Sequence, residues 1–346
     1  MFVPPAGVEG ERAGYRGPGG AAAPSPVPCW KERGERTLAG MRTSENTSGT
    51  GRIERVEVLT EERAGAVREL LAAAAGADGR EAVSEAGRLR IRPDSPRAGV
   101  RHLVQSVGGA VVGYAQVEGE RPGTVELTVA PAERGRGLGG ELVDAVLAEG
   151  EGGLDFWAHG GLPAARHLAE THGAVLVREL RQMRRTAAAP DAVPLPAGVE
   201  LRTFEPGRDE AAWLALNALA FAHHPEQGSW TEQDLAERIA EPWFDPKGFF
   251  LAERDGRLVG FHWTKTQPDG LGEVYVVGVD PAEQGNGLGR ALTAVGLRHL
   301  LLDRGLSTVM LYVDADNAAA VRVYERLGFT VHEVDLMYRW APSGAR

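Results

Sequence analysis

The feature that most constrains the fold of this chain is an internal repeat with the period of a whole domain. The segment VAPAERGRGLG (Val129–Gly139) matches VDPAEQGNGLG (Val279–Gly289) at eight of eleven positions, 150 residues further on. Just upstream, AVVGYAQV (Ala110–Val117) parallels RLVGFHWT (Arg257–Thr264) around a shared Val-Gly pair. Solenoid repeats have periods of about 20–50 residues, so a repeat of this length indicates a duplicated domain.

The two copies are separated by a segment with the composition of a linker. Thr186–Gly198 carries three prolines and has no helical period. We therefore expect a first domain over residues 52–186, a linker over 187–198 and a second domain over 199–346. Each copy is predicted to run from an initial helix through antiparallel strands to a strand that enters the glycine motif, then helix, strand, helix and strand. This order indicates an α+β fold built on an α/β-type mixed sheet.

Composition narrows the class of protein. A chain of 346 residues with 43% hydrophobic and 25% charged residues is typical of soluble globular domains, and we expect no membrane contact. The net charge of −10 argues against nucleic acid and favours a small-molecule partner. The single cysteine, Cys29, excludes an intrachain disulfide and is compatible with a cytoplasmic location. Residues 1–51 are rich in Gly, Pro and Ala and are predicted to be a disordered extension, within which Met41 is a candidate alternative start.

The repeated glycine motif predicts a binding loop for phosphate oxygens. A strand ending in Val-x-Pro, followed by Gly-x-Gly-x-Gly and a helix, turns several backbone N–H groups towards one point. A plain strand-to-helix turn is an alternative for one copy, but two copies with the same flanks disfavour it. The dinucleotide-binding fingerprint is a second alternative interpretation, since Gly135–Gly140 satisfies its pattern G-x-G-x-x-G. Arg290 breaks that pattern in the second copy, and neither loop follows a first β-strand as that fold requires.

The motif V-x-P-x-x-Q/R-G-x-G-x-G, together with the later N-x-x-A-x-x-x-Y-x-x-L-G-F of Asn317–Phe329, resembles the GNAT superfamily of N-acetyltransferases. The resemblance implies two tandem GNAT acyl-CoA N-acyltransferase domains, in which the glycine loop holds the pyrophosphate of acetyl-CoA and the adjacent strands splay to admit the thioester. The cofactor-binding residues so predicted are Leu127, Thr128, Val129, Arg134, Gly135, Arg136, Gly137, Leu138, Gly139, Val277, Gly278, Val279, Gln284, Gly285, Asn286, Gly287, Leu288, Gly289, Arg290, Asn317, Ala320 and Arg322.

The second copy is predicted to be the catalytic one. Glu273 stands six residues before Val279, on the strand that enters the loop, where it could take a proton from an amine as general base. Tyr324 occupies the position of the superfamily's general acid and could protonate the leaving thiol; a packed helix tyrosine is the alternative. In the first copy, counting back six residues from Val129 reaches Gly123, and aligning the last helices places Ala169 where Tyr324 stands. That copy is therefore expected to be non-catalytic, while its loop can still bind acetyl-CoA.

A narrower resemblance concerns the acceptor of the acetyl group. FAHHPEQGSW, FHWTK, GEVYVVGVDP and MLYVDADNAAAVRVYERLGF resemble tandem members that acetylate the cysteinyl amine of cysteinyl-glucosaminyl-inositol, the last step in making an intracellular protective thiol. That resemblance implies substrate contacts at Glu85, Glu226, Lys265, Glu273 and Tyr312. Without it, Glu85 and Lys265 would be interpreted as solvated charges and Tyr312 as a core tyrosine.

Other functions stay open at this point. The enzyme could acetylate another aminosugar or a peptide amine, and a non-catalytic acyl-CoA sensor would also use both loops. The adjacent His223 and His224 have no ligand spacing for a single ion, so we expect no metal. We expect a monomer that takes an aminosugar-type small molecule and acetyl-CoA, with direct attack in a ternary complex.

Overall fold

The computed structural model describes residues 51–93, 96–119, 122–148, 152–224 and 227–342. The extension predicted over residues 1–51, with Cys29 and Met41, lies outside the described residues except for Gly51. Glu226 also lies outside them. Within the described part of the chain, no helix is both long and apolar enough to cross a membrane.

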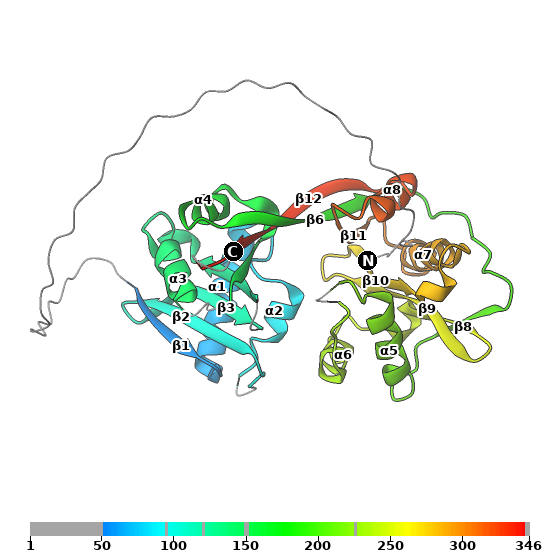
Figure 1. The fold of residues 1–346 in the computed structure, drawn as a ribbon, viewed down its shortest axis with the longest axis horizontal. Coiled ribbons are helices and arrows are strands. Elements are labelled where there is room, and N and C mark those ends of the chain that lie inside the picture. The colour runs from blue at the N-terminus through cyan, green and yellow to red at the C-terminus, as the bar shows by residue number, and fades with distance from the viewer. Residues whose placement is uncertain (1–50, 94–95, 120–121, 149–151, 225–226, 343–346) are drawn as a thin grey trace, which may run out of the picture. The chain divides into compact units, whose positions relative to one another are not determined.

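The first half of the described chain follows the predicted order of elements, except that an additional strand precedes the initial helix and a second, short helix follows it (Figure 1). Its elements are β1 (Arg52–Val56), α1 (Glu61–Asp78), α2 (Glu85–Leu89), β2 (Val100–Val107), β3 (Ala110–Glu118), β4 (Gly123–Val129), η1 (Pro131–Glu133), α3 (Leu138–Leu147), β5 (Leu154–Ala158), η2 (His159–Gly161), α4 (Pro163–Thr171) and β6 (Val175–Arg185). Local signals set the ends of α1: Thr60 accepts a hydrogen bond from the Arg63 N–H, and Gly79 closes the helix in a left-handed conformation.

The second half repeats this order. Its elements are β7 (Val199–Thr203), α5 (Glu210–Ala220), α6 (Glu232–Ile239), η3 (Pro246–Gly248), β8 (Phe249–Arg254), β9 (Arg257–Thr266), β10 (Gly272–Val279), η4 (Pro281–Glu283), α7 (Leu288–Arg298), η5 (His299–Asp303), β11 (Val309–Asp314), α8 (Ala318–Arg326) and β12 (Thr330–Trp340). The domain boundaries at residues 186 and 199 stay a prediction; β6 ends at Arg185 and β7 begins at Val199.

The described strands form one continuous mixed sheet, in the order β1-β2-β3-β4-β5-β12-β6-β11-β10-β9-β8-β7. The α+β prediction is therefore confirmed, but the sequence did not indicate that the halves exchange their last strands. The last strand of the first half, β6, pairs antiparallel with β11, and the C-terminal strand β12 pairs antiparallel with β5. Figure 1 shows β6 and β12 side by side where the halves meet. Side chains of the first half thereby reach the sheet of the second.

Helices cover both faces of the sheet in the second half. One face packs Val277 and Val279 of β10 with residues of α7 and α8. The opposite face packs Val276 and Trp263 with residues of α5 and α6. Trp263 is completely buried and stacks on Phe249 with ring centroids 4.4 Å apart. This double layer holds β10 rigidly at the centre of the second half, where the predicted base resides.

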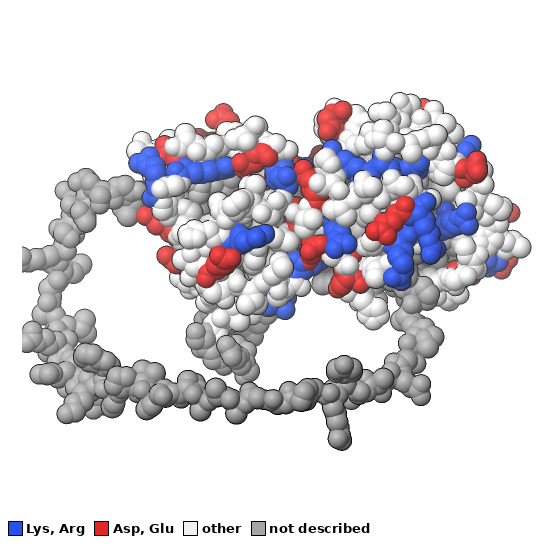
Figure 2. Space-filling view, turned by 90° about the horizontal axis from the view of Figure 1, so that it is seen from above, with Lys and Arg blue, Asp and Glu red and all other residues white. Residues whose placement is uncertain are grey.

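Ion pairs join the halves on the α6 side. The guanidinium of Arg90, which follows α2, lies 3.2 Å from Asp234 and 3.1 Å from Glu237 of α6. Arg97 pairs with the same two carboxylates and lies 2.8 Å from Glu237. Arg90 is only 8% exposed, so these charges form a largely desolvated network. Elsewhere, on the face that Figure 2 shows, acidic and basic side chains are interspersed.

Candidate active site

Strands β10 and β11 separate shortly after they begin to pair. Their parallel ladder contains only the pairs Gly272–Val309 and Glu273–Met310, although β10 continues to Val279. The register between β10 and β9 shifts between Val274 and Val276, which makes Tyr275 the extra residue of a β-bulge. Beyond the Glu273–Met310 pair, β10 forms no further described ladder pairs with β11. This opening has the form of the splay that the GNAT resemblance implied.

The glycine loop of the second half has the backbone conformation that a phosphate-binding turn needs. Gly285 and Gly287 have φ angles of 82° and 92°, and Gly287 is the N-cap of α7. No atom lies within 4 Å of a Cβ added to either, so the left-handed backbone, rather than crowding, requires glycine there. The N–H groups at the start of α7 favour an anion, although Asn286 Oδ1 accepts a hydrogen bond from the Leu288 N–H at 3.0 Å.

The first half builds the same loop. Gly135 and Gly137 have φ angles of 76° and 89°, and Gly137 is the N-cap of α3. In both loops a side chain braces the end of the preceding strand: Arg134 Nε donates to the Val129 carbonyl at 3.0 Å, and Gln284 Nε2 donates to the Val279 carbonyl at 3.4 Å. These side chains hold the loops, and the predicted pyrophosphate contacts would come from backbone N–H groups.

The remaining predicted cofactor residues lie around these two loops. Asn317 Oδ1 accepts from the Ala320 N–H at 3.1 Å and so caps α8, while Ala320 is completely buried. Arg290 and Arg322 are exposed on the first turn of α7 and on α8. The others lie at the ends of β4 and β10, in the first loop or in the first turns of α3 and α7: Leu127, Thr128, Val129, Arg136, Leu138, Gly139, Val277, Gly278, Val279 and Gly289.

A single large cavity of about 1410 Å³ contains four of the five predicted substrate residues. Glu85 reaches it from α2 of the first half, Lys265 from β9, Glu273 from β10 and Tyr312 from β11. The structure thus brings together side chains up to 227 residues apart in sequence from Glu85 to Tyr312. Because both halves line it, the cavity could enclose a ligand larger than a simple amine.

Glu273 is the most perturbed carboxyl group in this cavity. It is 6% exposed, and burial, reinforced by the nearby Glu85, raises its pKa to about 7 against the opposing effect of Lys265. Gln267 Nε2 donates a hydrogen bond to its Oε2 atom. A carboxylate with a pKa near neutrality exchanges protons readily at physiological pH, which is what a general base requires.

The cavity also contains polar side chains that the sequence analysis did not identify. Tyr275 donates a hydrogen bond to Glu85 Oε2 at 2.6 Å, and Lys265 forms an ion pair with Glu85 Oε1. Burial alone would raise the pKa of Glu85, but Lys265 and Tyr275 lower it, so its carboxylate stays ionised. The hydroxyl of Tyr275 accepts from Arg238 Nε at 2.9 Å. Tyr275 could have been identified from the sequence, because it lies two residues after Glu273 on the same strand and residues with this spacing point to one face of a sheet.

Tyr324, the predicted acid, lies apart from this cavity. It is completely buried in the core cluster that also contains Val277, Val279 and Leu288, and it contacts Phe329 edge-on. It is not among the described residues that line the large cavity. Tyr324 therefore sits on the α7 and α8 side of β10, whereas Glu273 faces the cavity, and its role as an acid stays a prediction.

The corresponding strand of the first half carries no carboxylate at the position of Glu273. Strand β4 pairs with β3 in continuous register from Thr124 to Val129, without the bulge of β10. Glu273 pairs with Lys265, and the equivalent pair is Thr124 with Glu118. Counting residues had reached Gly123, which is one position too early because the bulge adds a residue. The structural equivalent, Thr124, is no base either.

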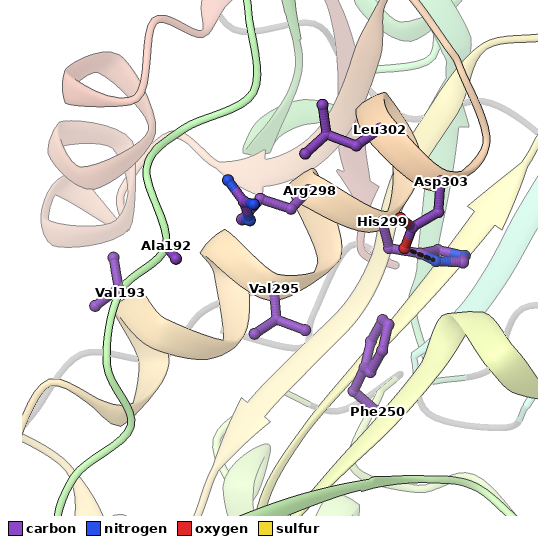
Figure 3. A pocket seen from close by; sticks show the side chains of 8 residues that line it. All are labelled: Ala192, Val193, Phe250, Val295, Arg298, His299, Leu302 and Asp303. Atoms are coloured by element: carbon purple, nitrogen blue, oxygen red, sulfur yellow. Dashed lines mark hydrogen bonds and ion pairs between the residues drawn. The ribbon is translucent and has the colours of Figure 1, made fainter.

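A second pocket lies apart from this site, whereas His224, one of the two adjacent histidines, lines the large cavity itself. A pocket of about 240 Å³ lies between Ala192 and Val193 on one side and α7 and η5 on the other, and His299 and Asp303 of η5 form a hydrogen bond of 3.1 Å there (Figure 3). It contains none of the predicted site residues. Among the described residues, no group of three His, Cys, Asp or Glu side chains is placed to hold a metal ion, and the expectation of no metal stays a prediction.

Comparisons with known proteins agree with this geometry. The profile of the Acetyltransferase (GNAT) family matches residues 213–329. A mycothiol acetyltransferase of Streptomyces avermitilis is 60% identical over 306 residues, which cover 86% of this chain and 99% of that protein. One from Thermomonospora curvata is 51% identical over 290 residues, covering 82% and 96%. A solved tandem GNAT protein from the clavulanic acid biosynthesis pathway is 21% identical, with a TM-score of 0.64 over 84% of this chain and all of its own.

The fold, the paired glycine loops and the splayed strands define a tandem-domain GNAT enzyme, an acetyl-CoA-dependent N-acetyltransferase. A second solved structure, a GCN5-related N-acetyltransferase from Sphaerobacter thermophilus, is 27% identical with a TM-score of 0.58 and covers 83% of this chain and 95% of its own. Within this class, the chain belongs to the mycothiol acetyltransferase family.

Proposed function

We propose that this enzyme transfers acetyl from acetyl-CoA to the cysteinyl amine of cysteinyl-glucosaminyl-inositol, the final step of mycothiol biosynthesis. The observation that carries the proposal is the buried Glu273 carboxylate, which faces a cavity shared with Lys265, Glu85 and Tyr312. Carboxylates, an ammonium group and a phenol suit a polyol that carries a free amine. The names of the relatives support this acceptor.

The proposed reaction divides the work between the two sides of β10. An α-amino group with a pKa near 7.7–8.0 is largely protonated at pH 7, and Glu273 would take its proton directly or through one water. Acetyl-CoA supplies the acetyl group as a thioester. Backbone N–H groups of Val277–Val279, on the splayed part of β10, would stabilise the negative charge on the carbonyl oxygen. Tyr324 would donate its phenolic proton to the leaving thiolate.

The roles of the remaining residues follow from the same proposal. The loops at Gly285–Gly289 and Gly135–Gly139 would each hold a pyrophosphate group, and only the second-half loop would support turnover. Glu85, Lys265 and Tyr312, with Glu226, would bind the acceptor. We further propose a cytoplasmic monomer without nucleic-acid or membrane partners, in keeping with the net charge of −10.

The proposal is tested by the release of free CoA with three acceptors: cysteinyl-glucosaminyl-inositol, glucosamine and a short peptide. We expect kcat/KM to be at least about 100-fold higher for the first, because the polar walls of the cavity would be left unpaired by the smaller acceptors. Preference for glucosamine or the peptide would retain an acetyltransferase and reject the proposed substrate. Acetyl-CoA binding without release of CoA in the presence of any acceptor would instead favour a sensor.

The second glycine loop gives a further prediction. Gly287→Ala should raise the KM for acetyl-CoA about tenfold, because an alanine at a left-handed φ costs roughly 1–2 kcal/mol and the loop can relieve it only by turning its N–H groups away. Gly207→Ala is the matched control: its φ is 85°, in an exposed turn away from the site, so it should carry the same strain without changing KM. Equal KM values for both variants would reject the loop as the pyrophosphate site.

A further inference from the structure

The hydroxyl group of Tyr312 is held by a chain of hydrogen bonds that begins on the exchanged strand β6. Gln182 of β6 lies directly opposite Tyr312 of β11 in the antiparallel register. Gln182 Nε2 donates to the Tyr312 hydroxyl oxygen at 3.0 Å, and Arg184 Nε donates to Gln182 Oε1 at 2.8 Å. All three side chains line the large cavity, and Gln182 is 7% exposed.

Arg184 fixes the direction of these hydrogen bonds. A guanidinium group can only donate hydrogen bonds, so the Gln182 atom that faces Arg184 must be the amide oxygen. The amide nitrogen then necessarily faces Tyr312, and the tyrosine oxygen acts as the acceptor. The side-chain amide therefore has one orientation, and the O–H hydrogen of Tyr312 must point elsewhere.

The cavity is where that hydrogen can go. Among the described residues, Gln182 is the only one that hydrogen-bonds to Tyr312, and Glu273 does not. Burial, followed by the negative charge of Glu273, raises the pKa of Tyr312, so its hydroxyl stays protonated. In the ladder, Glu273 lies opposite Met310, two residues before Tyr312 on β11, so Tyr312 and Met310 point to one face of the sheet. A donor is thus fixed close to the proposed base.

We propose that Gln182 and Arg184 are positioning residues that set the Tyr312 hydroxyl as a hydrogen-bond donor to the carbonyl oxygen beside the reactive amine of the acceptor. This inference rests on the proposed function, whose acceptor amine belongs to an α-amino amide. It identifies the recognised group as an amine with an adjacent carbonyl, rather than an amine alone. It also gives the strand exchange a function, because the first half supplies two residues that orient a substrate contact of the second.

The test is a double-mutant cycle on the full-length enzyme with cysteinyl-glucosaminyl-inositol as acceptor. Gln182→Met should lower kcat/KM for the acceptor about tenfold, with KM for acetyl-CoA unchanged. Tyr312→Phe should cost at least as much, and the double variant should be no worse than Tyr312→Phe, because the amide acts only through the hydroxyl. Additive losses, or wild-type kcat/KM in Gln182→Met, would overturn the inference.

An isosteric variant separates this effect from misfolding. Gln182→Glu keeps an acceptor for Arg184, but its carboxylate would accept the Tyr312 hydrogen and so turn the donor away from the cavity. We expect a loss in kcat/KM at least as large as for Gln182→Met, with an unchanged melting temperature. Full activity of Gln182→Glu would contradict the proposal that Gln182 orients the Tyr312 hydroxyl. If the wild-type enzyme acetylates only another amine, the proposed substrate is wrong. The same five proteins, the wild type and its four variants, assayed on that amine then test separately whether Gln182 positions Tyr312.

Discussion

Replacement of Glu273 by glutamine is expected to lower kcat for acetyl transfer by about 10²- to 10⁴-fold, the usual contribution of a positioned general base. Glutamine keeps the size and the hydrogen-bonding capacity of this buried side chain but cannot accept a proton. The measurement is CoA release at saturating concentrations of both substrates, with acetyl-CoA binding measured separately and expected to be unchanged. Glu200→Gln, an exposed carboxylate on β7, is the matched control and should keep full activity.

The pH dependence of this activity has a defined sign. Glu273 works as a base only when ionised, and burial raises its pKa to about 7, so kcat/KM should rise with pH through about 7. A second limb near pH 8 would belong to the acceptor amine and should persist in Glu273→Gln, whereas the limb near 7 should disappear. A limb near 7 that persists unchanged in Glu273→Gln would show that another group is the base.

The stability of the same variant provides its folding control. The folded-state pKa of Glu273 is raised, so the ionised carboxylate destabilises the fold at pH values above its ordinary pKa of 4.5, and the penalty is complete above about 7. At about 1.4 kcal/mol per pH unit, glutamine should stabilise the enzyme by up to about 3 kcal/mol at pH 8 and by little below pH 5. A loss of activity accompanied by a higher melting temperature at pH 8 cannot result from misfolding.

Much of the fold could be predicted from the repeat. The strand expected to enter the second glycine motif is β10, Gly272–Val279, and the initial helix expected in the first copy is α1, which Thr60 caps. The exchange of β6 and β12 could not be predicted, because each final strand has a similar alternating pattern and would bury its apolar face equally well in either sheet. The strand with which each final strand pairs depends on contacts between the two copies, and the sequence repeat does not reveal these contacts.

The active site, like the fold, could be predicted only in part from the sequence. Glu273 could be located because its strand enters the glycine loop, and the resemblance supplied Lys265, Glu85 and Tyr312, which the structure brings into one cavity. The bulge at Tyr275 could not be recognised, since one inserted residue leaves no mark on the composition of a strand; it displaced the counted equivalent of Glu273 by one position. Gln182 was missed for a different reason: it reaches the site only through the strand exchange.

Replacement of Asp234 by alanine is expected to destabilise the enzyme by about 3–5 kcal/mol, the range found when one partner of a buried ion pair is removed. Asp234 is 7% exposed and lies 3.2 Å from Arg90, and it also pairs with Arg97. Its Oδ2 atom accepts the Thr231 N–H at 2.9 Å and completes a capping box at the start of α6. Alanine would leave two guanidinium groups short of a partner and remove the cap.

This loss should appear in the active site as well as in the melting temperature. Arg90 ends α2, the helix that carries Glu85 into contact with Lys265, so the network with Asp234 holds Glu85 in the cavity. We expect a fall in melting temperature on the order of 10 °C, together with a higher KM for the acceptor and an unchanged KM for acetyl-CoA. Glu232→Ala, an exposed carboxylate in the same first turn of α6, should change none of these. A melting temperature and acceptor KM for Asp234→Ala equal to those of Glu232→Ala would show that the ion pairs between α2 and α6 do not position Glu85.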